Sequence, residues 1–239
     1  MFLQSVTAAA FGTNCYVLAT GPGEDCLIVD PGIGVEAAVG EILREHRLRP
    51  AAVLLTHGHL DHVYAVTPLC APGVAAWIHP DDEYRLEDPL ALLDPALVAM
   101  LEQQFGQRAQ WEQPEDVRTL DAGTALDLAG MRLQVSHAPG HTEGSVLLAV
   151  EDVPAGVPGD LDRTVLTGDV LFAGSIGRTD LPGGDHDAML RSLRDVVLPL
   201  ADSSLVLPGH GPATTMARER VTNPFLTGLG APGRGAARG

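Results

Sequence analysis

The chain has 239 residues, a length that suits one large domain or two fused half-domains. Hydrophobic residues make up 45% of it, which is enough for a substantial core. The formal net charge is -16, with 15 Lys and Arg against 31 Asp and Glu, so the basic surface that neutralises phosphates is missing and we expect no nucleic-acid partner.

Apolar patterns predict a series of short elements in the first part of the chain. Strands are predicted at 2–7, 14–19 and 26–29. Residues 35–47 change to helical spacing and predict an amphipathic helix. The wholly apolar run 51–56 is typical of a strand that is buried on both faces, and it stops at His57.

The middle of the chain contains a segment of different composition. A helix is predicted near 62–70, and a buried strand follows at 74–80. The stretch 81–114 is acidic and leucine-rich, and its helical pattern is broken by Pro89 and Pro95. We interpret it as a helical insertion over the active face. Further strands are predicted near 117–120, 124–127, 131–137 and 145–150.

The last third of the chain predicts a loop, a strand, a helix and a final strand. Residues 151–163 are rich in Pro, Gly and Asp and predict a loop, and 164–169 predicts a buried strand that ends on an acidic residue. An amphipathic helix is expected over 186–200, with Asp185 as its N-cap. The strand at 205–210 ends on a histidine.

The two halves of the chain look alike, because each has antiparallel strands, a helix and buried strands that end in polar residues. Two sheets covered by outer helices fit the rules for layered packing, so we expect an α/β fold. Side chains at the ends of several buried strands then converge at one edge. Residues 1–227 are expected to form this domain, and 228–239, rich in Gly, Ala and Arg, a disordered tail.

The strongest local motif in the sequence is His57-Gly58-His59-Leu60-Asp61-His62. It follows a strand, and Gly58 allows a tight turn, so His57 and His59 can face one metal ion while Asp61 and His62 face a second. Imidazole and carboxylate are ligands shared by zinc, iron and manganese. Three further residues each follow a strand or a Pro-Gly turn and are placed to project from the same edge: His141, Asp169 and His210.

The cysteines and the N-terminus bear on the compartment. Cys15, Cys26 and Cys70 are widely spaced and form no CxxC pair, so neither a disulfide framework nor a thiolate zinc cluster is predicted. The N-terminus has no positively charged segment, and no apolar run is long enough to span a bilayer. We therefore expect a cytoplasmic protein without a membrane partner. The sequence does not indicate the oligomeric state.

The ordered set HxHxDH, then His, Asp and His, resembles the metallo-β-lactamase superfamily over about residues 10–226. The resemblance implies a four-layer αββα sandwich with two mixed β-sheets flanked by helices. It also implies two divalent metal ions. The first would be held by His57, His59 and His141, the second by Asp61, His62 and His210, and Asp169 would bridge them.

Three segments are similar to short bacterial glyoxalase II-like hydrolases, namely SIGRTDLPGGD (175–185), PGHGPATT and TNPF. This resemblance implies that a hydroxide bridging the metals, held by Asp169 and oriented by Asp61, cleaves a small-molecule thioester into a hydroxy acid and a thiol. Zinc is the first choice of metal, with iron or manganese as alternatives. The two-domain glyoxalase II enzymes bind glutathione through basic residues of an added helical domain. This chain has no lysine and ends soon after His210, so we expect a different thiol carrier.

Other activities stay open at this point. The GRTD segment is also similar to persulfide dioxygenases, in which His57, His141 and Asp169 would hold a single ferrous ion. A lactonase, another metallohydrolase or a non-catalytic metal-binding member are further alternatives. The metal content per chain separates the dinuclear hydrolase from the mononuclear iron enzyme.

Residues outside the ligand set are candidates for contact with the substrate. Arg178 is expected either to fix its loop through Asp180 or to lie near a substrate carboxylate. His79 and His137 follow strands near the site, and we expect structural hydrogen bonds or substrate contact. Asp30, in a VDPG turn, is expected to shape the metal-binding loop.

Overall fold

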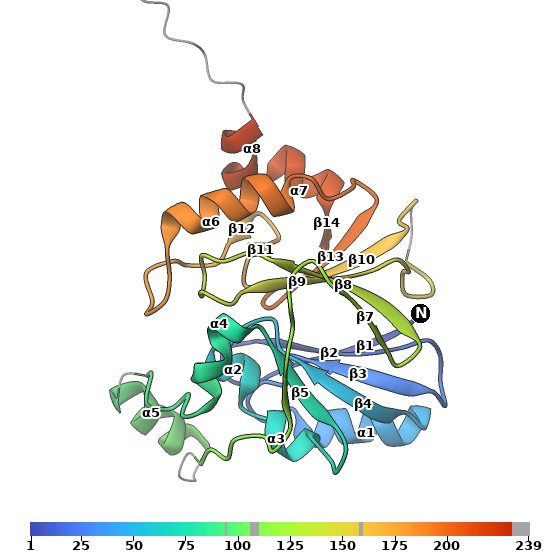
Figure 1. The fold of residues 1–239 in the computed structure, drawn as a ribbon, viewed down its shortest axis with the longest axis vertical. Helices are drawn as coiled ribbons and strands as arrows, with labels where there is room; N and C mark the ends of the chain where they lie inside the picture. Colours follow the sequence, from blue (N-terminus) through green and yellow to red (C-terminus); the bar gives the residue numbers. More distant parts are fainter. Residues whose placement is uncertain (94, 106–109, 158–159, 231–239) are drawn as a thin grey trace, which may run out of the picture.

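Two six-stranded β-sheets pack face to face, and helices cover the outer face of each (Figure 1). This arrangement comes from a computed structural model, which describes residues 1–93, 95–105, 110–157 and 160–230. The four layers follow from the alternation of apolar residues in the strands, since each sheet must bury both of its faces.

The first sheet has the strand order β1-β2-β3-β4-β5-β6. Its strands are β1 (Phe2–Thr7), β2 (Asn14–Ala19), β3 (Asp25–Val29), β4 (Arg49–Leu54), β5 (Ala75–Ile78) and β6 (Val117–Thr119). The first three strands pair antiparallel, and β3 to β6 pair parallel, so the sheet is mixed.

The second sheet has the order β14-β13-β10-β9-β8-β7, and a separate two-stranded hairpin, β11-β12, lies beside it. The strands are β7 (Ala125–Leu128), β8 (Met131–His137), β9 (Val146–Val150), β10 (Arg163–Gly168), β11 (Leu171–Phe172), β12 (Ser175–Ile176), β13 (Ser204–Pro208) and β14 (Thr214–Thr215). Only β10 and β13 pair parallel, so this sheet is mixed as well.

The helices form the two outer layers and part of one end of the molecule (Figure 1). They are α1 (Glu36–His46), α2 (Leu60–Val63), α3 (Val66–Leu69), α4 (Pro80–Glu83), the 3-10 turn η1 (Tyr84–Leu86), α5 (Pro95–Phe105), α6 (His186–Ser192), its π-helical continuation η2 (Leu193–Val197), α7 (Met216–Thr222) and α8 (Pro224–Gly230). Asp185 caps α6, because its carboxylate accepts a hydrogen bond from the Ala188 N–H at 2.8 Å.

Alternate residues of one strand enter different hydrophobic cores. In β2, Cys15 and Val17 belong to the core beneath α1, whereas Tyr16 and Leu18 belong to the core between the sheets. In β9, Leu147 instead faces the core beneath α6 and α7. This period of two explains why the central strands are apolar on both faces. The expected α/β fold, with two mixed sheets flanked by helices, is confirmed.

Most departures from the expected elements concern helices. The single helix expected near 62–70 consists of two short ones, α2 and α3. Pro95 begins α5 rather than breaking a helix, in keeping with the preference for proline in a first turn. The tail expected from Gly228 starts inside α8, which continues to Gly230, and 231–239 lie outside the described residues. In the described residues no helix is long and apolar enough to cross a membrane.

Candidate metal centre

Segments that follow four strands of the two sheets meet at one end of the sandwich. The histidine-rich motif comes directly after β4, and His141 lies in the loop between β8 and β9. Asp169 follows β10, and His210 follows β13. The parallel pairing of β10 with β13 brings Asp169 and His210 to the same edge. The structure thus brings together all seven residues of the expected ligand set.

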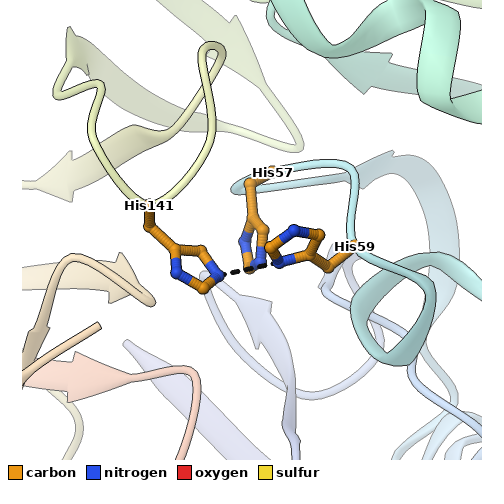
Figure 2. A group of neighbouring side chains, drawn as sticks. All are labelled: His57, His59 and His141. Atoms are coloured by element: carbon orange, nitrogen blue, oxygen red, sulfur yellow. Dashed lines mark hydrogen bonds between the residues drawn. The ribbon is translucent and has the colours of Figure 1, made fainter. Parts of the chain in front are cut away.

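His57, His59 and His141 form the first cluster (Figure 2). Their potential ligand atoms all lie within 4.8 Å of one another. The Nδ1 of His59 is 2.8 Å from the Nε2 of His141, and the His57 ring faces both at centroid distances of 4.9 and 4.7 Å. Three imidazoles that converge in this way make one face of a metal site.

Asp61, His62 and His210 form the second cluster. The Nε2 of His210 lies 3.3 Å from both the Oδ2 of Asp61 and the Nε2 of His62. The hydroxyl of the buried Thr13 donates a hydrogen bond of 2.7 Å to Asp61 Oδ2. That bond holds the Asp61 carboxylate in a fixed orientation.

Asp169 lies between the two clusters. Its Oδ2 is 3.5 Å from the Nε2 of His141 and 3.3 Å from the Nε2 of His210, and its Oδ1 is 3.4 Å from the Nε2 of His62. The Asp169 carboxylate therefore reaches residues of both clusters, so it could bind two neighbouring cations at once.

Hydrogen bonds on the far side of three rings set which nitrogen faces the centre. The Nδ1 of His141 donates to the carbonyl oxygen of Arg178 at 2.8 Å, and the Nδ1 of His62 is 3.0 Å from Asp30 Oδ2. The Nδ1 of His57 lies 3.1 Å from the hydroxyl of Thr56. Each contact directs Nε2 toward the centre, where its lone pair can bind a metal ion when the ring is neutral.

Asp30 organises the histidine-rich loop, as the sequence predicted. Its carboxylate accepts hydrogen bonds from the N–H and the hydroxyl of Thr56, at 2.7 and 2.6 Å, besides contacting His62. The residue is buried and has a φ of 50°, in the left-handed region that Asp tolerates better than most residues. The three buried contacts of the Asp30 carboxylate stabilise this strained backbone conformation.

The histidines of the two clusters differ in the direction of their pKa shifts. Burial, strengthened by the neighbouring His62 and His141, lowers the pKa of His57 well below its ordinary value. Burial also lowers the pKa of His59, to about 3, and that of His141. These three rings are therefore neutral, which is the state that coordinates metals.

The second cluster is dominated by carboxylates. Burial opposes the charged form of His62, but Asp169, Asp61 and Asp30 together raise its pKa well above the ordinary value. Burial also opposes the charged form of His210, yet hydrogen bonds to Asp169 and Asp61 raise its pKa to about 9. In the metal-free chain these histidines carry positive charge that cations would replace.

The donor set fits divalent metal ions. In the described part of the chain, the buried Nε2 of His57 and the buried Oδ1 of Asp169 form no hydrogen bond. Leaving such groups unpaired in a protein interior costs about 1–3 kcal/mol each, so both require a partner. A cation held by the first cluster would pair with His57 Nε2, Asp169 would serve the cations of both clusters, and imidazole with carboxylate suits Zn, Fe or Mn.

A buried carboxylate outside the ligand set, Asp82 at the end of α4, joins the two loops of the first cluster. Its Oδ2 accepts hydrogen bonds from the Gly58 N–H and the Thr142 hydroxyl, both at 2.7 Å. Its Oδ1 accepts from the Gly144 N–H at 2.8 Å and from Arg85 Nε at 3.2 Å. The loop of His57 and His59 is thereby fixed to the loop of His141.

Arg85 extends this connection. It is 1% exposed, and its Nη2 donates to Glu143 Oε2 at 2.6 Å and to the Pro182 carbonyl at 3.0 Å. Asp82 and Arg85 were not predicted from the sequence, because they lie in the segment 81–114 that was interpreted as an insertion. The available signal was an Asp–Arg pair at helical spacing directly after a buried strand.

Two glycines are required by close approach rather than by an unusual backbone. A Cβ on Gly58 would lie 2.6 Å from Cδ of Arg85, so this glycine makes room for the buried guanidinium side chain. The tight turn expected from Gly58 does not use a positive φ. A Cβ on Gly209 would collide with the Asp169 carboxylate and the His62 ring. Both positions exclude a side chain because the ligands or their supports occupy the space.

Both clusters open into a cavity of about 750 Å³, because His59 and His141 line it together with Asp61, Asp169 and His210. Arg178 lines it, and its guanidinium also forms a two-pronged ion pair with Asp180 at 2.7 and 2.8 Å. His79 and His137 are not among the described lining residues. Their rings stack on each other at 4.0 Å, and His137 Nε2 donates to the Glu143 carbonyl at 2.7 Å. The structure places them with the supporting loop rather than with the cavity.

Comparison with known proteins agrees with this geometry. The family model for the metallo-beta-lactamase superfamily matches residues 8–210. An uncharacterized protein of Mycobacterium tuberculosis is 43% identical over 231 residues, 96% of this chain and 99% of that protein. The hydroxyacylglutathione hydrolase GloC of Haemophilus influenzae is 34% identical over 228 residues, 95% of this chain and 98% of that one. Among solved structures, TTHA1623 in a di-iron-bound form has a TM-score of 0.71 and 36% identity, with 93% of this chain and 100% of that chain covered.

The chain belongs to the metallo-β-lactamase superfamily. Members of this superfamily bind divalent metals, and the described residues provide the histidine and aspartate clusters for them. The resemblance stated from the sequence is confirmed, including the similarity to a hydroxyacylglutathione hydrolase.

Proposed function

We propose that the protein is a dinuclear metallohydrolase that cleaves a thioester, in the manner of a glyoxalase II, into a 2-hydroxy acid and a thiol. The observation that carries this proposal is the pair of complete ligand clusters that share Asp169. The 34% identity to a hydroxyacylglutathione hydrolase over nearly its whole length supports the reaction class.

His57, His59 and His141 would hold one ion and Asp61, His62 and His210 the other, with Asp169 between them. Divalent ions in such a site lower the pKa of water toward neutrality and polarise a substrate carbonyl. Zinc is our first choice because of the ligand set, and iron is the main alternative because a 36% identical protein is known in a di-iron-bound form.

Side chains and a backbone carbonyl around the centre orient the ligand residues. Thr13 fixes the Asp61 carboxylate by a 2.7 Å hydrogen bond, so one carboxylate oxygen keeps a constant direction toward the reacting centre. Asp30, Thr56 and the Arg178 carbonyl hold the histidine rings in single orientations. In the overall reaction one water is consumed, the carbonyl carbon gains oxygen, and the sulfur leaves as a thiol.

A mononuclear persulfide dioxygenase would need only His57, His141 and Asp169. The second cluster is complete, with His62 buried and Asp61 and His210 half-buried. An intact ligand set alone does not separate the two activities, so the preference for the hydrolase rests on the 34% identity to a hydroxyacylglutathione hydrolase.

The test begins with metal content. Protein purified without chelators or a metal-affinity tag is analysed for metals and assayed for thiol release from 2-hydroxyacyl thioesters. We expect close to two metals per chain, mainly zinc, and an efficiency of about 10⁴ M⁻¹s⁻¹ or more with the preferred thiol. One iron per chain together with persulfide-dependent oxygen uptake would overturn the proposal.

A further inference from the structure

The wall of the cavity opposite the metal ligands is apolar. It is built by three segments that are distant in sequence: the turn between β1 and β2, the segment leading into α5, and the β11–β12 hairpin. Its main side chains are Phe11, Leu92, Leu93, Leu97, Phe172 and Ile176. The Phe172 ring stands edge-on to the His210 ring at a centroid distance of 6.0 Å, so the apolar wall begins directly beside the ligands.

Two of these side chains are exposed to solvent without an apparent structural reason. Phe11 is 47% and Leu92 is 40% exposed. Apolar side chains gathered at the opening of a cavity typically mark a binding surface.

Phe11 is also held in an unfavourable backbone conformation. Its φ is 61°, in the left-handed region that large side chains rarely adopt. The turn is closed by the Ala8 N–H, which donates to the Thr13 carbonyl at 2.8 Å, while the Thr13 side chain holds Asp61. The strained residue therefore keeps a defined position relative to the metal centre, which is typical of functional sites.

The cavity offers little to an anionic ligand. Of its described lining residues, Arg178 is the only one other than histidine that can carry positive charge, and its Nε and Nη2 both donate to Asp180. The chain contains no lysine, and its formal charge is -16. Away from the metal ions, a ligand with several carboxylates would therefore find few cationic side chains to pair with among the described lining residues.

We propose that this cavity selects thioesters that carry an uncharged, apolar group beside the scissile carbonyl. The inference rests on the proposed function, since it names the substrate class for that reaction. Phe11, Leu92 and Phe172 contact the apolar group, and the carbonyl lies toward Asp61 and His210. Thioesters of glutathione, whose peptide carries two carboxylates, are poorer substrates.

Matched substrates test this directly on the metal-loaded protein. The first pair has the same lactoyl group on glutathione and on benzyl mercaptan. The second is a series of N-acetylcysteamine thioesters with acyl chains of increasing length. We expect kcat/KM to be at least about tenfold higher for the benzyl thioester, or to rise by about threefold to fourfold per methylene in the acyl series. The first result places the apolar group in the thiol, and the second places it in the acyl chain. Preference for the glutathione thioester with no gain in either arm overturns the proposal.

A charge placed in the wall gives a second test. Leu92→Arg should lower kcat/KM for the preferred apolar substrate by about tenfold or more and shift the ratio toward the glutathione thioester. Met100, on α5, is 52% exposed and does not line the cavity, so Met100→Arg is the matched control. Equal substrate preference in the two variants would contradict the assignment.

A binding measurement separates this inference from the proposed function. The uncharged dye N-phenyl-1-naphthylamine, added to metal-loaded protein, should bind with increased fluorescence, at least tenfold more weakly in Leu92→Arg and normally in Met100→Arg. If no thioester is hydrolysed, the proposed function fails, and this dye series still decides whether the cavity binds apolar groups. Equal dye affinity in all three proteins overturns the inference.

Discussion

The two sides of the cavity are built in different ways. On the ligand side, buried polar contacts fix nearly every group: Asp30 and Asp82 together accept hydrogen bonds from the backbone or side chains of both ligand loops. On the opposite side, Leu92 and Phe172 contribute apolar surface to the cavity.

This difference indicates that the ligand side of the cavity serves metal binding and the apolar side serves substrate selection. Metal binding depends on the positions of single atoms, which hydrogen bonds in a buried setting define sharply. Selection of an apolar group depends on area and shape, which several side chains share. Substitutions on the ligand side should therefore change metal content and kcat together, whereas substitutions on the opposite side should change KM and substrate preference.

The largest effect is expected from Asp169→Asn. The amide keeps the shape of the side chain but removes the charge that both clusters share, so we expect activity to fall by at least about a thousandfold and bound metal to fall below two per chain. The control is Asp127→Asn on the exposed strand β7, which should keep full activity and metal content. An active Asp169→Asn protein with two metals would contradict the shared role.

A smaller but clear effect is expected from Asp82→Asn. Two of the four hydrogen bonds to this buried carboxylate are replaced by donor–donor contacts, and Arg85 loses its charge partner. We expect a loss of about 10–100-fold in activity or metal affinity and of about 3 kcal/mol in the free energy of unfolding.

The neighbouring Asp81→Asn provides the control for this variant, because Asp81 is exposed and contacts only the stacked histidines. Metal titration followed by the recovery of activity distinguishes a positioning role from a general loss of stability. If excess metal does not restore activity in Asp82→Asn, the variant has lost more than metal affinity. If the two variants behave alike, Asp82 does not connect the ligand loops.

On the apolar side, Phe172→Ala should leave metal content unchanged. It removes an aromatic surface next to His210, so we expect kcat/KM for apolar thioesters to fall by about threefold to tenfold, mainly through KM. The control is Phe225→Ala on α8, which removes an exposed ring away from the cavity and should have no effect on kinetics. A loss of bound metal in Phe172→Ala would show that the two sides are not independent.

The smallest effect concerns the pH dependence of the chelated protein. The pKa of His210 in the folded chain is raised to about 9 from an ordinary value of 6.5, so its contribution to stability is complete below pH 6.5 and is lost as pH rises through 9. We expect the Tm of the metal-free protein to fall by roughly 2–5 °C over this range. His210→Gln should reduce the slope, and a wild-type slope in this variant would show that another group causes it.

The longer strands, and the residues that the structure brings together at the metal centre, could be predicted from the sequence, whereas the two-residue strands β11, β12 and β14 could not. The strands at 2–7, 14–19 and 131–137 were predicted with the bounds that the structure shows, because apolar residues define them directly, as a continuous run in 15–19 and in alternation in 131–137. The residues His57 to His62 were found because a strand end followed by closely spaced ligands is a local pattern. The structure places them together with three ligands from distant segments.

Other features could not be predicted, since they depend on tertiary contacts. The short helix α7 carries Glu219, whose carboxylate binds Gly174, Thr214 and Asn223 in a buried network. A helix of seven residues is too short for its sequence pattern to predict that Glu219 holds a buried hydrogen-bond network. The apolar wall is likewise assembled from three segments whose proximity no local pattern reveals.

The three segments of that wall are not equivalent for engineering. Phe11 shares a turn of a few residues with Thr13, whose hydroxyl holds Asp61 and whose backbone forms a β-bridge with His210. Randomising that turn in a directed-evolution library would disturb catalysis along with selectivity. The leucines before and in α5 have no such connection, so libraries at these positions should yield altered substrate ranges with intact metal centres. Selectivity should be easiest to redirect there, and comparison of the two libraries would measure how separable recognition is from chemistry in this fold.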